Sequence, residues 1–281
     1  LLPEQLEDFC QRNKRPDGNP YLLILNYPGN PDGITYGAES VKQLAETCRK
    51  NNIYILSDEI YGQLHHEGKH VSIAKYYPEG TIISSGLSKW CGAGGWRLGT
   101  FSFPAKLHWL MDAMAAVASE TYTSVSAPIQ YAAIQAFLCG SEIENYLSHV
   151  RKILALLGKE TAAILKNGNI SVNDPTGGFY LFLDFTPLSE KLVKRGIADG
   201  SILCDRLLDE CGVAILPGVD FNRPAEELSA RLSYVDFDGA KALSASYSIP
   251  LHEKFPADFL FQYCGNVIEA AEKIVEWGNA E

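Results

Sequence analysis

The chain has 281 residues, of which 46% are hydrophobic and 21% charged, and its formal net charge at pH 7 is −10. This length and composition exclude a disordered chain and allow one large domain or two moderate ones, while the acidic balance argues against nucleic acid or an anionic membrane as a partner. The apolar runs are shorter than a membrane span, the first residues do not resemble a signal peptide, and the seven cysteines lie without a CxxC pair, so we expect a cytoplasmic protein with reduced thiols.

The first part of the chain alternates between strand and helix patterns. A short helix is expected over residues 1 to 13, and a second over Ala38 to Lys50, where apolar residues recur at helical spacing. The run Tyr21 to Leu25 is continuously apolar, so we expect it to be buried on both faces of a parallel sheet. Strands are expected at Tyr21 to Leu25, Ile53 to Leu56, Thr81 to Ser84 and Arg97 to Phe103. The alternation indicates a doubly wound α/β domain.

The second part has a different pattern. Helices are expected at Ala105 to Ala118, Ala127 to Leu138 and Glu142 to Lys166, the last long enough to link two domains. After it, short strands at Phe179 to Asp184 and Arg231 to Val235 mix with helices at Ile202 to Cys211 and Gln262 to Trp277. We therefore expect a large domain over residues 1–145, followed by a linker helix and a small α+β domain over residues 146–281.

Polar motifs follow three of the expected strands. The turn NYPGNPDG, residues 26 to 33, follows the first strand, and SDEIYG follows the second. The third runs into SSGLSKWCGAGGWRLG, in which Lys89 is surrounded by small residues. Ligands bind at the carboxyl ends of strands in open α/β sheets, and a desolvated lysine there is a nucleophile towards an aldehyde. Taken alone, Lys89 is more simply interpreted as a surface lysine in a glycine-rich loop.

Together with RLSYV, these motifs resemble the series found in the class I/II aminotransferases, the pyridoxal-phosphate enzymes of fold type I. The motifs occur in the same order, with 28 residues from Asn30 to Asp58, 31 from Asp58 to Lys89 and 8 from Lys89 to Arg97. The resemblance runs from Tyr21 to the last helix. It implies that residues 1–145 form a partial pyridoxal-phosphate-binding large domain with an incomplete, mostly parallel sheet, and that the rest is the small domain.

The resemblance implies a role for each motif around the cofactor. Lys89 would form the internal aldimine with the cofactor aldehyde and then move the proton from the substrate α-carbon. Asp58 would pair with the pyridine nitrogen and keep it protonated. Tyr61 and Asn30 would hydrogen-bond the phenolate oxygen, and Asn30 would also contact the substrate. The alternatives are a helix N-cap for Asp58, a core aromatic for Tyr61 and a turn residue for Asn30.

Two arginines complete the implied site. Arg97 would bind the cofactor phosphate through its planar guanidinium, with Ser85 and Ser88 as candidate phosphate-binding hydroxyls. The position three before the lysine is often serine in the family and is Gly86 here, so the choice between the two serines is open. Arg231 would bind the substrate α-carboxylate by a two-pronged salt bridge, and its alternative is an exposed strand arginine.

Two further features affect the expected site. The run HHEGKH contains three histidines, but Gly68 breaks the helical spacing and no further ligand is fixed by spacing, so we expect no metal. Asp32 stands where the family's turn usually has threonine, and because either side chain can hydrogen-bond locally, we expect the turn to persist.

The resemblance also implies a segment before LLPEQLEDFC that this chain lacks. We therefore expect a sheet that exposes apolar edge and face surface, and a chain that binds the cofactor weakly or not at all when alone.

The function implied is that of a pyridoxal-phosphate-dependent aminotransferase, a homodimer when full length, which moves an amino group from an L-amino acid to a 2-oxo acid by a ping-pong mechanism. The alternatives are a carbon–sulfur lyase of the same fold and the non-catalytic aminotransferase-like module of a regulator.

Overall fold

The computed structural model describes residues 1–15 and 17–280, which form two compact units. The first unit contains Leu1–Pro28 and Thr35–Leu147, and the second contains Gly29–Ile34 and Ser148–Glu281. The sequence-based division after residue 145 lies close to Leu147. Nothing in the sequence pattern predicted that residues 29–34 group with the second unit.

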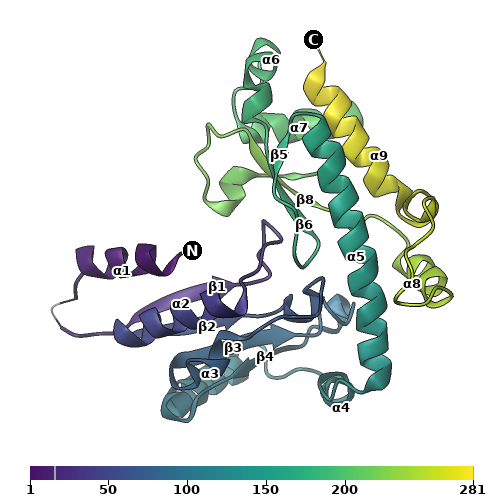
Figure 1. Ribbon diagram of the computed structural model, residues 1–281. Coiled ribbons are helices and arrows are strands. Elements are labelled where there is room, and N and C mark those ends of the chain that lie inside the picture. The colour runs from purple at the N-terminus through teal and green to yellow at the C-terminus, as the bar shows by residue number, and fades with distance from the viewer. Residues whose placement is uncertain (16, 281) are drawn as a thin grey trace. The chain divides into compact units, whose positions relative to one another are not determined.

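The first unit is built on one four-stranded sheet (Figure 1). Its strands lie in the order β1-β2-β3-β4; the first three are parallel and β4 is antiparallel to β3. The expectation of a mostly parallel α/β sheet is therefore confirmed. The bounds are β1 (Tyr21–Asn26), β2 (Ile53–Asp58), β3 (Thr81–Gly86) and β4 (Gly99–Ser102).

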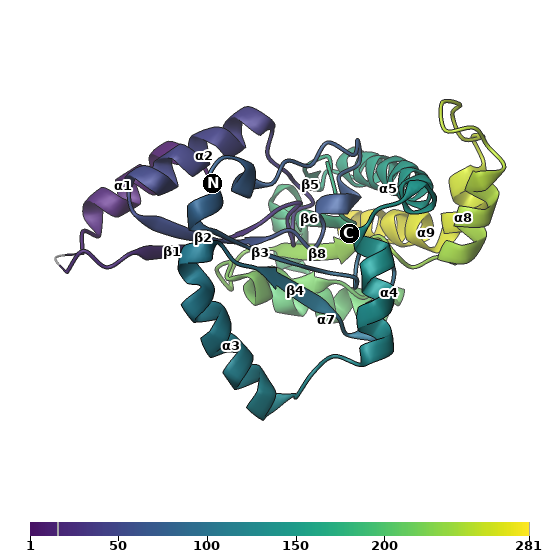
Figure 2. The same cartoon turned by 90° about the horizontal axis from the view of Figure 1, so that it is seen from below.

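Helix α2 (Ala38–Lys50) connects β1 to β2 and has the predicted bounds. Its buried residues are Val41, Leu44, Ala45 and Cys48, and α1 (Pro3–Arg12) packs against it. Both helices lie on one side of the sheet, whereas α3 extends away on the other (Figure 2). Between β2 and β3 the chain forms three short 3-10 turns instead of an α-helix, so the strand–helix alternation is less regular than predicted.

The expectation that β1 is buried on both faces is wrong. Leu25 is buried, but Leu22 is 60% exposed and Ile24 is 67% exposed. β1 is an edge strand of the sheet, and its alternate side chains point to opposite faces, of which α2 covers one. These exposed side chains agree with the expectation of uncovered apolar surface on the sheet.

The helices after β4 also carry exposed apolar side chains. A 3-10 turn at Ala105–Leu107 leads into α3 (His108–Thr121), which has no buried residue, and α4 (Ala127–Phe137) follows. The exposed side chains on these two helices include Trp109, Val117, Tyr131 and Ile134. Large apolar patches of this kind usually mark a contact surface.

The second unit contains a separate antiparallel sheet with the strand order β5-β6-β8-β7. Its strands are β5 (Ser171–Val172), β6 (Tyr180–Asp184), β7 (Leu216–Pro217) and β8 (Ser229–Ser233). Its helices are α6 (Ser189–Lys194), α7 (Gly200–Cys211), α8 (Gly239–Tyr247) and α9 (Phe259–Asn279), and α5 (Ser141–Asn167) runs into it from the first unit. The predicted α+β character is confirmed, although β5, β7, α6 and α8 are too short for periodicity to reveal.

In the part of the chain that the structure describes, none of the helices combines the length and the apolar character needed to cross a membrane.

Candidate active site

Asp58 stands at the carboxyl end of β2, in register with Asn26 on β1 and Ser84 on β3. Its carboxylate accepts a hydrogen bond from Asn26 Nδ2 at 3.1 Å and one from the backbone N–H of Ile60 at 3.4 Å. Burial raises the pKa of Asp58, and these hydrogen bonds oppose the rise. The chain continues into a 3-10 turn at Gly62–Leu64 and not into an α-helix. Asp58 therefore does not cap an α-helix, which was the alternative role considered for it.

Lys89 lies in a tight turn directly after β3. The turn is fixed by hydrogen bonds from the Gly92 N–H to the Lys89 carbonyl and from the Ala93 N–H to the Leu87 carbonyl. Lys89 is partly buried, and its Nζ lies 5.8 Å from the centre of the Tyr61 ring. Tyr61 itself is 4% exposed. The lysine is therefore held beside a buried tyrosine and is not a freely exposed loop residue.

Gly86 has a steric reason to be glycine. It pairs with Gly99 across β3 and β4, and a Cβ at this position would lie 2.6 Å from the Leu98 carbonyl oxygen. Such a distance is shorter than real Cβ contacts allow, so a serine here would force β3 and β4 apart. The close approach of these strands therefore requires glycine at this position.

The predicted phosphate-binding residues are placed differently from one another. Arg97 is exposed and lies outside β4, which corrects the expected strand from Arg97 to Phe103. Its φ of 54° lies in the left-handed region, which is strained for a residue with a side chain. Its guanidinium donates a hydrogen bond to the Gly94 carbonyl at 2.8 Å.

The two candidate serines lie in different surroundings. Ser88 lies in the same turn as Lys89, whereas Ser85 lines a cavity of about 100 Å³ together with Glu59.

Asn30 and Arg231 are brought together within the second unit. The guanidinium of Arg231 donates a hydrogen bond to Asn30 Oδ1 at 2.9 Å, and its planar group lies 4.6 Å from the ring centre of Tyr180 and 4.9 Å from that of Phe221. Arg231 Nε is buried without a hydrogen-bond partner among the described residues. An exposed strand arginine would not be held by a hydrogen bond and two aromatic rings in this way.

The turn that carries Asn30 is held by its own side chains and by the second sheet. Asp32 Oδ1 accepts a hydrogen bond from the Ile34 N–H at 3.1 Å, so the expectation that the turn persists with aspartate is confirmed. The carbonyl of Gly33 accepts hydrogen bonds from the N–H groups of Thr176 and Gly177. Gly33 has a φ of 67°, and a Cβ there would lie 2.4 Å from the Tyr180 carbonyl oxygen, which only glycine can accommodate.

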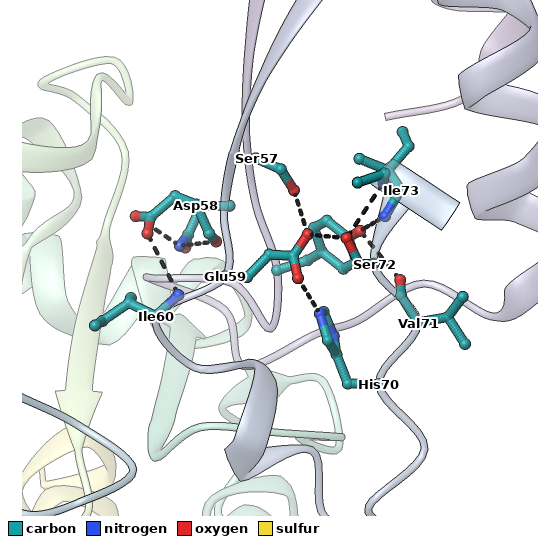
Figure 3. Close-up of polar contacts among 11 residues, drawn as sticks. Ser57, Asp58, Glu59, Ile60, His70, Val71, Ser72 and Ile73 are labelled. Atoms are coloured by element: carbon teal, nitrogen blue, oxygen red, sulfur yellow. Dashed lines mark hydrogen bonds and ion pairs between the residues drawn. The ribbon is translucent and has the colours of Figure 1, made fainter. Parts of the chain in front are cut away.

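A buried polar cluster on the opposite side of β2 was not recognised from the sequence (Figure 3). Glu59 accepts hydrogen bonds from Ser57 Oγ at 2.9 Å and Ser72 Oγ at 2.6 Å, and its other oxygen lies 3.0 Å from His70 Nε2. His70 belongs to the run considered above as a metal cluster. Across residues 1–15 and 17–280, no group of three or more potential metal-binding side chains is found. The signal available in the sequence was an acidic residue directly after Asp58.

Comparisons with known proteins agree with the motif series. A family model described as "Aminotransferase class I and II" matches residues 4–240. The aspartate aminotransferase of Geobacillus stearothermophilus is 34% identical over 83% of this chain, and the aspartate/prephenate aminotransferase of Thermus thermophilus is 33% identical over 75% of it.

The similarity extends to solved structures. A structure of Thermus thermophilus aspartate aminotransferase with maleate has a TM-score of 0.73 and 26% identity, over 98% of this chain and 62% of that one. The chain spans about half the length of the curated relatives it matches, 56% and 51% in the two named above. On the strength of the family model and of these relatives, the chain belongs to the class I and II aminotransferase family, whose members depend on pyridoxal phosphate and share fold type I.

Proposed function

We propose that the protein is an aminotransferase that moves an amino group from an L-amino acid to a 2-oxo acid, in two half-reactions of a ping-pong mechanism. The observation that carries this proposal is the arrangement at the carboxyl ends of β2 and β3: Asp58 ends one strand, and Lys89 lies beside Tyr61 in the turn after its neighbour. The family membership supports it.

The side chains of the first unit fit pyridoxal phosphate chemically. A carboxylate suits a protonated ring nitrogen, a phenol suits the ring oxygen, an amine suits the aldehyde and a guanidinium suits the phosphate. Asp58, Tyr61, Lys89 and Arg97 supply one of each. When bound, the cofactor supplies an electron-withdrawing ring that stabilises a negative charge on the substrate α-carbon.

Asp58 would hold the ring nitrogen and keep it protonated. Because burial raises the pKa of Asp58, its carboxylate is poorly satisfied by water and has much to gain from a cationic partner. Asn26 fixes the orientation of the carboxylate through the hydrogen bond at 3.1 Å. We propose that this preorganised carboxylate binds the cofactor more tightly than a solvated one would.

Lys89 would attach the cofactor covalently and act as base and acid in turn. Its Nζ would take the proton from the substrate α-carbon and return it on the cofactor side. The hydrogen-bonded turn fixes the backbone from which this side chain extends. Of the two candidate hydroxyls for the phosphate, we propose Ser88, because it shares that turn, whereas Ser85 lines the cavity beside Glu59.

Arg231 would bind the substrate α-carboxylate. The rings of Tyr180 and Phe221 hold its guanidinium in place, and planar arginine groups bind carboxylates through two parallel hydrogen bonds. Asn30, which already contacts Arg231, would share this carboxylate and also contact the cofactor's ring oxygen. The exposed apolar side chains of α3 and α4 favour a homodimer.

The function is tested by incubating the cofactor-loaded protein with one amino acid and no oxo acid. An aminotransferase converts one equivalent per site and stops, with the visible absorbance shifted to that of the amino form. Aspartate, alanine and aromatic donors are the first to try. Continuous release of ammonia would contradict the proposal in favour of a carbon–sulfur lyase, and no spectral change with any donor would favour a non-catalytic module.

A further inference from the structure

The end of β2 carries two carboxylates on consecutive residues that point to opposite sides of the strand (Figure 3). Asp58 faces Asn26, and Glu59 faces His70 and Ser72. The proposed function uses Asp58 and gives Glu59 no role. Yet the Glu59 side chain is only 10% exposed, and a buried carboxylate is costly unless it is fully hydrogen-bonded.

Glu59 meets that requirement through three side chains. Ser57 Oγ and Ser72 Oγ donate to Oε1 at 2.9 and 2.6 Å, and His70 Nε2 lies 3.0 Å from Oε2. Burial alone would raise the pKa of Glu59, but the hydrogen bonds from His70, Ser72 and Ser57 outweigh it, and the pKa is lowered. The side chain is therefore ionised and held in a single orientation.

The histidine that partners Glu59 is itself fixed. Its ring packs against Tyr27, with centroids 5.0 Å apart, and a Cβ at Gly62 would lie 2.9 Å from it. The fully buried Tyr27 accepts a hydrogen bond from the Ile73 N–H at 2.7 Å and donates one to the Val71 carbonyl at 3.1 Å. The segment after His70 is thus clamped to the end of β1, and Glu59 has a rigid partner.

Two links connect this cluster to Asp58. The backbone N–H of Glu59 donates to the Ser84 carbonyl at 2.8 Å, which extends the pairing of β2 with β3 by one residue. The Ile60 N–H, on the other side of Glu59, donates to the Asp58 carboxylate. A fixed Glu59 therefore fixes the backbone from 58 to 60. Its charge also adds to burial in raising the pKa of Asp58.

We infer that Glu59 is a positioning residue for Asp58: locked by His70, Ser57 and Ser72, it fixes the turn after β2 and so holds the Asp58 carboxylate in the orientation that the cofactor's ring nitrogen requires. This inference rests on the proposed function, because it assumes that Asp58 binds that nitrogen. Glu59 does not touch the cofactor in this arrangement, since its side chain points away from Asp58 (Figure 3).

The first test measures the affinity of the cofactor-free protein for pyridoxal phosphate by its visible absorbance. Glu59→Leu removes all three hydrogen bonds, so the affinity should fall about tenfold, as is common when a residue that orients a ligating group is lost. Glu59→Gln keeps the shape and can still bond the serines, so it should rescue most of the affinity. Ser72→Ala removes one bond and provides a milder variant, with an intermediate loss, should Glu59→Leu fail to fold.

The matched control is His149→Gln in the second unit. His149 is 5% exposed and its Nδ1 lies 2.7 Å from Ser246 Oγ, so its loss should also destabilise the protein but leave the cofactor affinity unchanged. Equal affinity in the wild type and in both Glu59→Leu and Ser72→Ala would overturn the inference. A loss in Glu59→Gln as large as that in Glu59→Leu would overturn it too, because charge and not orientation would then be what matters.

A second measurement does not need the cofactor. Carbon-13 NMR of the cofactor-free protein reports the pKa of Asp58, around which Asn26 and Ile60 are hydrogen-bond donors and Glu59 is a charged neighbour. Glu59→Gln removes a negative charge, so the pKa of Asp58 should fall. An unchanged value would mean that the Glu59 carboxylate does not lie close to Asp58 in solution, and would contradict the arrangement on which the inference rests. If instead the coupling is present but the cofactor-loaded wild type gives no spectral change with any amino donor, the proposed function is what fails.

Discussion

The two sides of β2 at its carboxyl end make a direct comparison, since each carries one partly buried carboxylate. Burial raises the pKa of both groups, yet Asp58 ends above its ordinary value and Glu59 below. The difference lies in the donors. Asp58 accepts hydrogen bonds of 3.1 and 3.4 Å from Asn26 and Ile60, whereas Glu59 has three partners at 2.6 to 3.0 Å.

The end of one strand can thus serve chemistry and stability at once. A carboxylate that the protein satisfies poorly is available to a ligand, and one that it satisfies fully contributes to the fold. Lys89 and Tyr61 are the functional partners proposed for the Asp58 side, while His70 and Ser72 complete the Glu59 side. Substitutions on the two sides should therefore fail in different ways.

The largest effect is expected for Lys89→Ala, on the side of Asp58. Turnover should fall by about four orders of magnitude, because the base that moves the substrate proton is lost. The midpoint of thermal unfolding should stay close to that of the wild type, since Lys89 is only partly buried. Steady-state kinetics and thermal denaturation check both statements.

Lys106→Ala is the matched control for Lys89→Ala. The Nζ of Lys106 lies 4.8 Å from the ring centre of Tyr54, so this lysine also stands near a tyrosine ring but has no proposed part in the chemistry. Its removal should leave turnover unchanged. Retained turnover in Lys89→Ala would refute the assignment of the active-site lysine.

On the other side of β2, Glu59→Leu should act on stability. Because His70 and the two serines would be left buried without their acceptor, the free energy of unfolding should fall by about 3–5 kcal/mol. Urea denaturation measures it. Glu79→Ala is the control, since Glu79 pairs with Arg49 at 2.7 Å with both side chains nearly half exposed, and such surface pairs contribute less than about 1 kcal/mol. Similar losses in the two variants would remove the distinction between them.

A smaller effect is expected for Gly86→Ala at the end of β3. The new Cβ would lie 2.6 Å from the Leu98 carbonyl oxygen, and relieving such a clash typically costs about 1–3 kcal/mol. Gly99→Ala is the control on the paired strand, because its Cβ would meet its nearest atom, the Ser85 carbonyl oxygen, at 3.6 Å. Urea denaturation should show the larger loss for Gly86→Ala, and equal losses would contradict the close approach of β3 and β4.

Periodicity and strand-end motifs were sufficient to predict much of the first unit. The bounds of α2 followed from its apolar spacing, and the position of Asp58 followed from the end of a buried run. The sequence pattern did not show on which face of the sheet Ser85 lies. The expected strand ended at Ser84, but β3 continues to Gly86, and successive side chains of a strand point to opposite faces.

The contacts that the sequence did not reveal are long-range or lie in irregular backbone. Asn30 and Arg231 are separated by 201 positions, and Glu59 and His70 are joined across a segment whose only helical part is the 3-10 turn Gly62–Leu64. Arg97 has a positive φ, which removes it from the strand that its neighbours predict. No local pattern encodes these features, because they depend on which segments meet after folding.

The smallest expected effect is a difference in the acid sensitivity of stability between the two sides of β2. The pKa of Glu59 is below its ordinary value of 4.5 in the folded state, so the stability it provides is complete above that pH and is lost as the pH falls through the lowered pKa. The pKa of Asp58 is above its ordinary value of 3.8, so the cost of its charge is present at neutral pH and is relieved as the pH falls through the raised pKa.

Glu59→Gln and Asp58→Asn should therefore change the acid limb of the stability curve in opposite directions. Without the titration of Glu59, the free energy of unfolding should decline less steeply between about pH 5 and pH 3, and without that of Asp58 it should decline more steeply. Urea denaturation at a series of pH values measures both slopes against the wild type, and each pKa unit of difference between folded and unfolded states corresponds to about 1.4 kcal/mol. Slopes that change in the same direction would show that the two carboxylates occupy equivalent environments, and the comparison of the two sides of β2 would then be wrong.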